Sequence, residues 1–142
     1  MLTDLSSIYS RRDMALLYAW ELLRIPYEWR DEDFSGMDCS GFFSEVMCAC
    51  GREPHGTRLT VKLIAGRYPV VETIRPGCAA LYGRTVPSHV MLCLNETYVI
   101  GSTGGGSSTT NVEAADEVAA FVKVRPLRYR SDLMFIVDPF ER

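Results

Sequence analysis

The sequence predicts an α+β domain in which N-terminal helices pack on a small antiparallel sheet, and three observations predict this class. Apolar residues recur at helical spacing in the first half of the chain, up to Ala65. After Pro76-Gly77 they form short runs separated by turn residues, as strands do. Two of these runs flank Asn95-Glu96-Thr97, a tight turn typical of a hairpin. Helices followed by strands are the order of an α+β fold.

The first helix has a clear start. Ser10 can cap it, and Asp13 lies three residues further on, as in a capping box. One apolar face follows, made of Met14, Leu17, Tyr18 and Leu22. Because Pro26 disfavours helical geometry in the residue before it, we expect this helix to end near Ile25.

A second helix is predicted over residues 39–50. The acidic stretch 28–36 before it is expected to be a loop, Asp38 is a suitable N-cap, and Gly51 is a suitable stop. A third, shorter helix is expected over residues 58–65.

The strands are expected in the second half of the chain. They cover residues 79–82, 89–94, 98–100, 119–124 and 134–137. Residues 101–110, G-S-T-G-G-G-S-S-T-T, are low in complexity and are expected to form a mobile surface loop. The 142 residues have the length of one ordinary domain, so we expect a single domain over residues 1–142.

Charge and composition argue against several classes of function. The formal net charge is −3, which disfavours a broad surface for nucleic acid. A basic segment runs from Arg125 to Arg130, but Pro126, Leu127 and Tyr129 interrupt it, and we interpret it as a solvated edge. The chain has no stretch of about 18 apolar residues, so no membrane span is expected.

Cysteine usage and the first residues bear on location. The five cysteines are odd in number and include no C-x-x-C pair, which fits a reducing compartment. Residues 1–12 carry charges and no apolar core of signal-peptide length. We therefore expect the protein to be cytoplasmic as synthesised.

Cys39 is the best candidate for a nucleophile. It lies in G-M-D-C-S-G at the predicted start of a helix, where backbone N–H groups and the helix dipole lower a thiol pKa. Gly36 and Gly41 permit a close backbone approach to a substrate. The Asp38 carboxylate acts in the opposite direction, because a nearby negative charge raises a thiol pKa. The alternative interpretation is a buried structural cysteine, a common position for a free thiol.

A thiol nucleophile needs a base, and the chain has only two histidines. His55 lies in P-H-G, an irregular turn, and we interpret it as a surface residue. His89 lies at the predicted start of a core strand, which would hold a catalytic base rigidly. We therefore expect His89 to take the proton of Cys39 and to pass it to the leaving amine.

A third group normally orients the imidazole of such a pair. We expect it on the partner strand of the hairpin, where Gly101 has no side chain and Ser102 offers a hydroxyl. Ser102 is therefore our candidate for the third catalytic position. A backbone carbonyl or Asn111 is the alternative.

A metal site is the weaker interpretation of the remaining candidates. Cys48, Cys50 and His55 supply three ligands, but side chains two apart on a helix do not face each other. Structural zinc sites use other spacings. The run Gly104-Gly105-Gly106 has no lysine after it and is not a phosphate-binding loop. We expect no metal and no cofactor.

Four segments within residues 14–102 follow one another in a distinctive order. They are I-P-Y-E-W, D-C-S-G, R-P-G-C-A-A-L-Y and S-H-V-M-L-C-L-N-E-T-Y-V-I-G. In this order they resemble the NlpC-type cell-wall cysteine peptidases. The resemblance implies a compact papain-like domain in which a helix carries the nucleophile and a small antiparallel sheet carries the base. It also implies hydrolysis of peptidoglycan stem peptides, typically after γ-D-glutamate, without a cofactor.

The resemblance assigns roles by position. Cys39 matches the nucleophile and His89 matches the general base. Tyr27 matches a tyrosine that helps to form the substrate pocket. Asp38 and Ser40 match positions that hold the peptide substrate in some members.

The sequence departs from the family pattern at two positions. The third catalytic position, usually His, Asn or Gln, aligns with Gly101 or its neighbour, and Met91 stands where glycine is common. The chain also resembles small phage or prophage members. That resemblance implies release by lysis, or carriage in a phage particle with phage tail proteins as partners.

The leading hypothesis is a cysteine peptidase that acts on peptidoglycan stem peptides. The second hypothesis is a catalytically inactive NlpC-type binding or structural module, such as a phage tail component. A related thiol enzyme, an amidase or acyltransferase, is the third.

Overall fold

The computed structural model describes residues 10–25, 37–103 and 121–141. Its helices are α1 (Arg11–Glu21), α2 (Cys39–Ala49) and α3 (Val61–Arg67). Its strands are β1 (Val70–Val71), β2 (Ala79–Tyr82), β3 (His89–Cys93), β4 (Tyr98–Thr103), β5 (Phe121–Pro126) and β6 (Leu133–Val137). Helices precede strands along the chain, so the predicted α+β class is confirmed. None of the described helices has the length and apolar character needed to cross a membrane.

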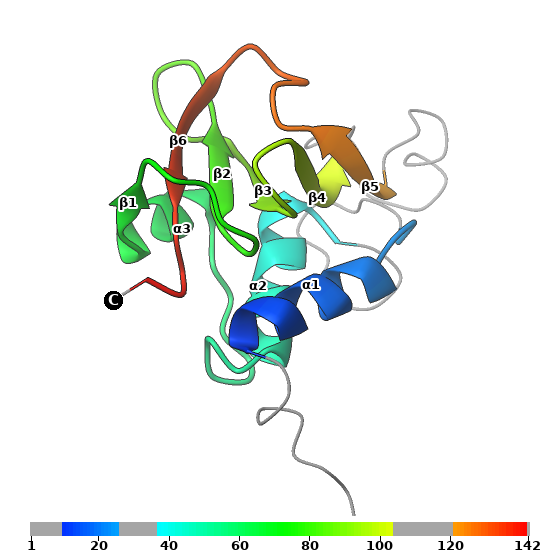
Figure 1. Cartoon of the computed structure of the whole chain (residues 1–142). Helices are drawn as coiled ribbons and strands as arrows, with labels where there is room; N and C mark the ends of the chain where they lie inside the picture. Colours follow the sequence, from blue (N-terminus) through cyan, green and yellow to red (C-terminus); the bar gives the residue numbers. More distant parts are fainter. Residues whose placement is uncertain (1–9, 26–36, 104–120, 142) are drawn as a thin grey trace, which may run out of the picture.

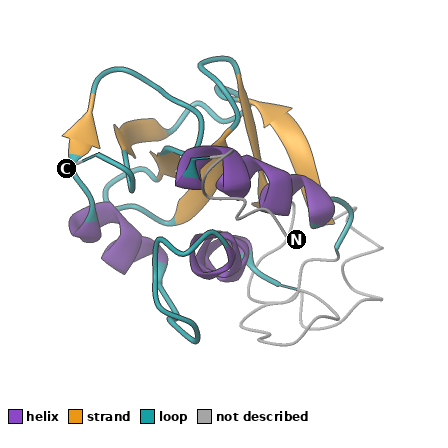
Figure 2. Cartoon of the chain, turned by 60° about the horizontal axis from the view of Figure 1, so that its bottom comes forward, coloured by secondary structure: helices purple, strands orange, loops and turns teal. Residues whose placement is uncertain are grey.

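The strands form one antiparallel sheet in the order β1-β6-β2-β3-β4-β5. The helices lie on one side of this sheet (Figures 1 and 2). β3 lies inside the sheet, paired with β2 on one side and with β4 on the other. A residue at the start of β3 therefore stands on a rigid support.

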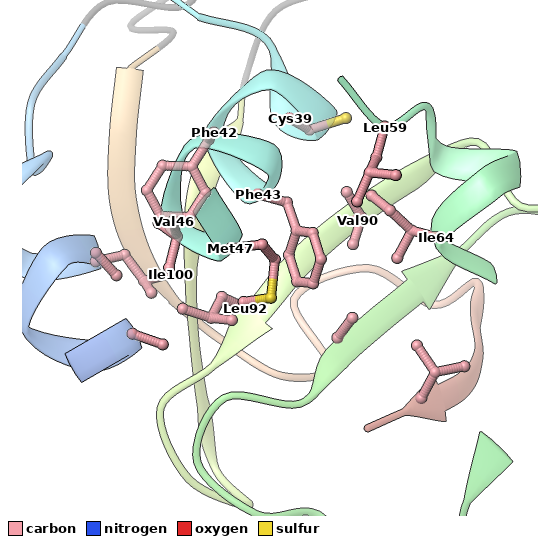
Figure 3. Close-up of a cluster of buried hydrophobic side chains, with 14 of the residues drawn as sticks. Cys39, Phe42, Phe43, Val46, Met47, Leu59, Ile64, Val90, Leu92 and Ile100 are labelled. Carbon is pink, nitrogen blue, oxygen red and sulfur yellow. The ribbon is translucent and has the colours of Figure 1, made fainter. Parts of the chain in front are cut away.

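The helix α2 forms the centre of the core (Figure 3). It packs on β3 and β4 through large apolar side chains, each almost fully buried. These are Phe42, Phe43, Val46 and Met47 on the helix and Val90, Leu92 and Ile100 on the strands. Burying a side chain of this size contributes about 1.5–3 kcal/mol. The packing therefore fixes the start of α2 relative to the start of β3.

The predicted starts of the first two helices are confirmed. The Ser10 hydroxyl accepts a hydrogen bond from the Asp13 N–H, and the Asp13 carboxylate accepts one from the Ser10 N–H. Asp38 caps α2 in the predicted way. The third helix begins later than predicted, after Thr60, because the Thr60 hydroxyl accepts the Leu63 N–H and sets the N-cap there.

The first helix ends at Glu21, earlier than predicted, because the residues that follow bond to the sheet. The Arg24 N–H donates to the Val122 carbonyl at 2.8 Å, and the Val122 N–H donates to the Ile25 carbonyl at 2.8 Å. These two bonds attach the end of α1 to the edge strand β5. They satisfy backbone groups that a further helical turn would otherwise pair.

Strand β4 is longer than predicted. Gly101, Ser102 and Thr103, expected in the surface loop, pair instead with residues 121–123 of β5. Pairing with a neighbouring strand overrides the low strand propensity of a glycine-rich segment. The short strand β1 is not predicted by the sequence, since it has only two residues. The remainder of the expected loop, residues 104–110, lies outside the described residues.

Arg12 joins α1 to the far end of the sheet. Its guanidinium donates two hydrogen bonds of 3.1 Å to Asp138 and one of 2.9 Å to the Pro76 carbonyl. Asp138 follows β6 and is 1% exposed. A buried carboxylate that loses its partner is strongly destabilising, so this pair holds the first helix against the C-terminal strand.

We expect Arg12→Met to lower the free energy of unfolding by about 3 kcal/mol, because it leaves the Asp138 carboxylate buried without its cation. Urea denaturation measures the change. Arg128→Met removes an exposed arginine and serves as the matched control, with an expected change of about 0.5 kcal/mol or less. Equal losses in the two variants would contradict a structural role for the buried pair.

Candidate active site

Cys39 is the first residue of α2. Its side chain lies at the start of the helix, on the side where Leu59 and Val90 lie (Figure 3). The backbone N–H groups of Val90, Ser40 and Cys39 itself act on the sulfur and favour the thiolate. The nucleophile predicted from the sequence therefore stands where α2 meets the start of β3.

The thiol is nevertheless held in its protonated form. Burial raises the pKa of Cys39 to about 11, with a further contribution from the Asp38 charge and against the effect of the backbone N–H groups. The backbone N–H groups at the helix start lower this pKa as expected, but desolvation outweighs them, so the pKa as a whole is raised and not lowered. Cys39 is 8% exposed, so little water remains to stabilise a thiolate.

His89 is the first residue of β3, and it lies on the sheet face opposite the helices. Tyr82 stands directly across from it on β2, with the two ring centroids 5.6 Å apart. Burial, and then the charge of Arg130, lower the pKa of His89 to about 4, against the opposing charge of Asp132. His89 is therefore neutral at pH 7, the form in which an imidazole accepts a proton.

Tyr129 holds the ring of His89. Its hydroxyl lies 2.8 Å from His89 Nε2 and 3.1 Å from Thr103 Oγ1. Burial raises the pKa of Tyr129, against the hydrogen bond with Thr103. Tyr129 lies between β5 and β6, 40 residues from His89 in the sequence. No local motif indicates that it contacts His89. The sequence analysis missed this residue.

Ser102, the candidate for the third catalytic position, has a different partner. Its hydroxyl donates to the Met37 carbonyl at 2.7 Å, on the helical side of the sheet. The register of β3 and β4 places Thr103, not Ser102, on the face of His89. Gly101, the position that the family pattern indicates, lies on that face but has no side chain, and its neighbour Ser102 points to the other face because side chains alternate along a strand. The alternative candidate Asn111 lies outside the described residues.

Cys39 and His89 approach the same end of β3 from opposite faces. The thiol reaches the backbone of Val90 from the helical side, while the imidazole packs against Tyr82 and Tyr129 on the other side. No hydrogen bond joins the thiol to the imidazole in the described part of the chain. The site therefore holds a neutral thiol and a neutral imidazole at one strand end.

Asp38 and Ser40, which the resemblance matched to peptide-holding positions, contact each other. Asp38 Oδ1 accepts the Gly41 N–H at 2.7 Å and lies 3.4 Å from the Ser40 hydroxyl. A Cβ atom on Gly41 would lie 2.8 Å from this oxygen and 3.7 Å from an Arg58 nitrogen. This crowding explains the glycine in D-C-S-G and identifies Arg58 as a neighbour that the sequence analysis missed. Tyr27 lies outside the described residues.

Cys48 and Cys50, two of the three ligands in the metal hypothesis, hydrogen-bond to backbone carbonyls. Cys48 Sγ donates to the Pro54 carbonyl at 3.3 Å, and Cys50 Sγ donates to the Met47 carbonyl at 3.5 Å. Among residues 10–25, 37–103 and 121–141, no group of three or more His, Cys, Asp or Glu side chains is placed to hold a metal ion.

Comparison with solved structures relates this architecture to known proteins. An NlpC/P60 family protein from Bacillus cereus ATCC 10987 matches with a TM-score of 0.70 and 17% identity, over 92% of this chain and 40% of its own. The peptidoglycan hydrolase RipB from Mycobacterium tuberculosis matches with a TM-score of 0.70 and 17% identity, over 99% of this chain and 70% of its own. RipD from the same organism, a non-catalytic NlpC/p60 domain protein, matches with a TM-score of 0.66 and 15% identity, over 91% of this chain and 97% of its own.

The chain has the NlpC/p60 fold. No protein-family model and no curated protein sequence gives a significant match, so the likeness lies in the structure. The chain spans 40% of the length of the B. cereus protein.

Two departures from the NlpC-type sequence pattern compensate each other within this NlpC/p60 fold. A Cβ atom on Gly101 would lie 2.7 Å from Met91 Sδ and 3.4 Å from Met91 Cε. Met91 therefore fills the volume that a side chain at position 101 would need. Position 101 on β4 thus carries no side chain. The hydroxyl that hydrogen-bonds to His89 belongs instead to Tyr129, which follows β5 in the chain.

We expect Gly101→Ala to lower the free energy of unfolding by roughly 1–3 kcal/mol, because the added methyl group overpacks against Met91. In a Met91→Ala background the same change should cost much less, since the obstructing sulfur is gone. Denaturation of the four proteins of this cycle measures the coupling. Gly66→Ala is the control, because a Cβ there meets no atom within 4 Å. Additive costs in the cycle would contradict the compensation.

The low pKa of His89 predicts an acid-dependent loss of stability. Unfolding returns the ring to its ordinary pKa of 6.5, so the unfolded chain binds a proton that the folded chain refuses until about pH 4. The free energy of unfolding should therefore fall by roughly 3 kcal/mol as the pH drops from 6.5 to 4. His89→Gln should remove this component, whereas His55→Gln, which replaces an exposed histidine, should retain it. Denaturation across this pH range tests it, and equal slopes for wild type and His89→Gln would refute it.

Proposed function

We propose that this chain is a cysteine peptidase that hydrolyses amide bonds in the stem peptides of bacterial peptidoglycan. The observation that supports this most directly is the placement of Cys39 and His89 at the same end of β3, with Tyr129 on one ring nitrogen of His89. The NlpC/p60 fold adds support, since RipB, a protein of that fold, is a peptidoglycan hydrolase.

The Tyr129 hydroxyl sets the tautomer of His89 in this proposal. We assign His89 Nε2–H as the donor to Tyr129 Oη, 2.8 Å away, and the Tyr129 hydroxyl as the donor to Thr103 Oγ1, 3.1 Å away. This direction leaves His89 Nδ1 unprotonated and able to accept the proton of a thiol. The opposite direction would place the proton on Nδ1 and prevent base catalysis.

Because the Cys39 thiol and the His89 imidazole are both neutral, the thiol proton has to pass to His89 during the attack. Binding of the peptide brings Nδ1 of His89 and the Cys39 sulfur together, and catalytic contacts of this kind tighten in the substrate complex. As the C–S bond forms at the scissile carbonyl, the thiol proton passes to His89. His89 then gives it to the amine nitrogen as the C–N bond breaks.

Water completes the reaction. His89 takes a proton from a water molecule, whose oxygen bonds to the thioester carbon while the C–S bond breaks, and the proton returns to Cys39. The backbone N–H groups of Cys39, Ser40 and Val90, which already act on the sulfur, supply donors for the negative charge that develops in each step.

A peptide-binding module without catalysis is the second candidate function. It is favoured by the raised pKa of the Cys39 thiol and by the absence of a described hydrogen bond between Cys39 and His89. RipD, which shares the fold, is a non-catalytic protein adapted to peptidoglycan binding. Hydrolysis of a stem peptide separates the two candidates.

We expect purified protein to cleave L-Ala-γ-D-Glu-L-Lys or its meso-diaminopimelate counterpart, and Cys39→Ala to abolish cleavage. Tyr129→Phe should lower kcat by roughly 10–100-fold with little change in KM, because it removes the group that orients the base. Tyr98→Phe is the matched control, since it removes a hydroxyl from a tyrosine that is 46% exposed. Product mass spectrometry and initial rates measure these effects.

The pH profile provides an independent check. The acidic limb of kcat/KM should lie toward pH 4 and not near 6.5, because His89 stays neutral down to that pH. A fully active Tyr129→Phe variant would overturn the orienting role. Intact peptide with wild-type protein, together with measurable binding, would favour the binding module.

A further inference from the structure

Tyr82 occupies a buried position beside both members of the hydrogen bond that holds the imidazole. It is the last residue of β2, it pairs with His89 across β2 and β3, and it is 0% exposed. Its ring centroid lies 5.6 Å from that of His89 and 5.6 Å from that of Tyr129. The ring of Tyr82 therefore packs against the base and against the tyrosine that contacts it.

The hydroxyl of Tyr82 reaches the segment that carries Tyr129. It donates a hydrogen bond of 2.7 Å to the Leu127 carbonyl. Leu127 is the first residue of the β5–β6 connection, residues 127–132, and Tyr129 follows two residues later. This bond is buried, so the carbonyl would be left without a partner if the hydroxyl were removed, and a buried acceptor without a donor is costly. The Tyr82 hydroxyl therefore fixes how the start of the connection lies on β2.

The β5–β6 connection is also attached to the end of β2 at its other end. The Gly83 N–H, directly after β2, donates to the Asp132 carbonyl at 2.9 Å. Tyr129 lies between the two attachments along the chain. Of the two, the bond from Tyr82 is made by a side chain, so it can be removed by substitution without changing the backbone.

The contact between Tyr129 and His89 depends on the position of this backbone. The Tyr129 N–H donates to the Pro126 carbonyl at 3.0 Å, so the residue is part of a turn whose start is held at Leu127. Its hydroxyl lies 2.8 Å from His89 Nε2, and such a bond weakens steeply when distance and angle depart from their optimum. A shift of the connection would therefore weaken the contact with the imidazole.

We propose that Tyr82 is a positioning residue of the candidate site, whose hydroxyl holds the β5–β6 connection so that Tyr129 reaches Nε2 of His89. Tyr82 acts through Tyr129 and takes no part in proton transfer. The catalytic consequence rests on the proposed function, whereas the effect on the imidazole can be measured without turnover.

NMR of the imidazole nitrogens in Tyr82→Phe tests the proposal. The substitution keeps the ring, and with it the packing against His89 and the Arg130 guanidinium, whose carbon lies 5.7 Å from the ring centroid of Tyr82. Wild type should show one neutral tautomer of His89, protonated on Nε2. We expect Tyr82→Phe to show a mixture of the two tautomers, because Tyr129 no longer holds Nε2 in place.

The titration of His89 gives a second readout. Burial and the Arg130 charge lower its pKa to about 4, against the Asp132 charge, and the neutral side chains of Tyr82 and Tyr129 pack on the ring. A loosened connection lets water reach the imidazole and moves Arg130 away. We therefore expect the pKa of His89 in Tyr82→Phe to rise by roughly one unit toward 6.5.

Tyr68→Phe is the matched control. Tyr68 is 4% exposed, and its hydroxyl donates to Glu53 Oε1 at 3.2 Å, so this variant also loses a buried hydroxyl with its hydrogen bond. It should lose stability as Tyr82→Phe does and leave the tautomer and the pKa of His89 unchanged. In a hydrolysis assay, Tyr82→Phe should lower kcat by about threefold to tenfold with little change in KM, and Tyr68→Phe should not.

Unchanged His89 signals in Tyr82→Phe, or equal changes in Tyr82→Phe and Tyr68→Phe, would overturn the positioning role. If Tyr82→Phe does not fold, Leu127→Ala takes its place, because Leu127 is 6% exposed and its side chain anchors the same connection in the core. Unchanged His89 signals in that variant would overturn the role as well. A chain that leaves stem peptides intact but shows the shift of His89 would contradict the peptidase and support the positioning role.

Discussion

The candidate site depends on the packing of α2 against β3 and β4. Phe43, Met47 and the side chains that face them are almost fully buried, so the helix cannot shift along the sheet without opening the core. This constraint places the first residue of the helix against the first residues of β3. Cys39 therefore meets the backbone of Val90, and His89 stands one residue away.

The same packing sets the electrostatics of the pair. A position deep enough to be rigid is also poorly solvated, and burial dominates the pKa of both groups. The thiol keeps its proton and the imidazole does not acquire one, so the helix terminus does not produce a preformed thiolate–imidazolium pair. Chemistry at this site has to begin from neutral groups, and the direction of the Tyr129 hydrogen bonds decides whether His89 can act as the base.

The surroundings of His89 depend on two neighbouring segments of the sheet. Met91 occupies the space beside Gly101, so β4 cannot supply a side chain there. The segment after β5 supplies Tyr129 instead, and Arg125 stacks on the same ring. The hydroxyl that contacts His89 and the guanidinium that stacks on its ring thus come from one part of the chain, whose position depends on the pairing of β5 with β4.

The sequence by itself determined the features that depend on short-range physics. The caps at Ser10 and Asp38, the start of the central helix and the position of His89 at the head of a strand follow from local hydrogen bonding and apolar periodicity. Tertiary structure decided what depends on distant segments. It extended β4 through Thr103, turned Ser102 to the other face, brought Tyr129 to His89 and reversed the expected pKa of Cys39. Strand register and desolvation are set by neighbours far away along the chain, and no local motif contains them.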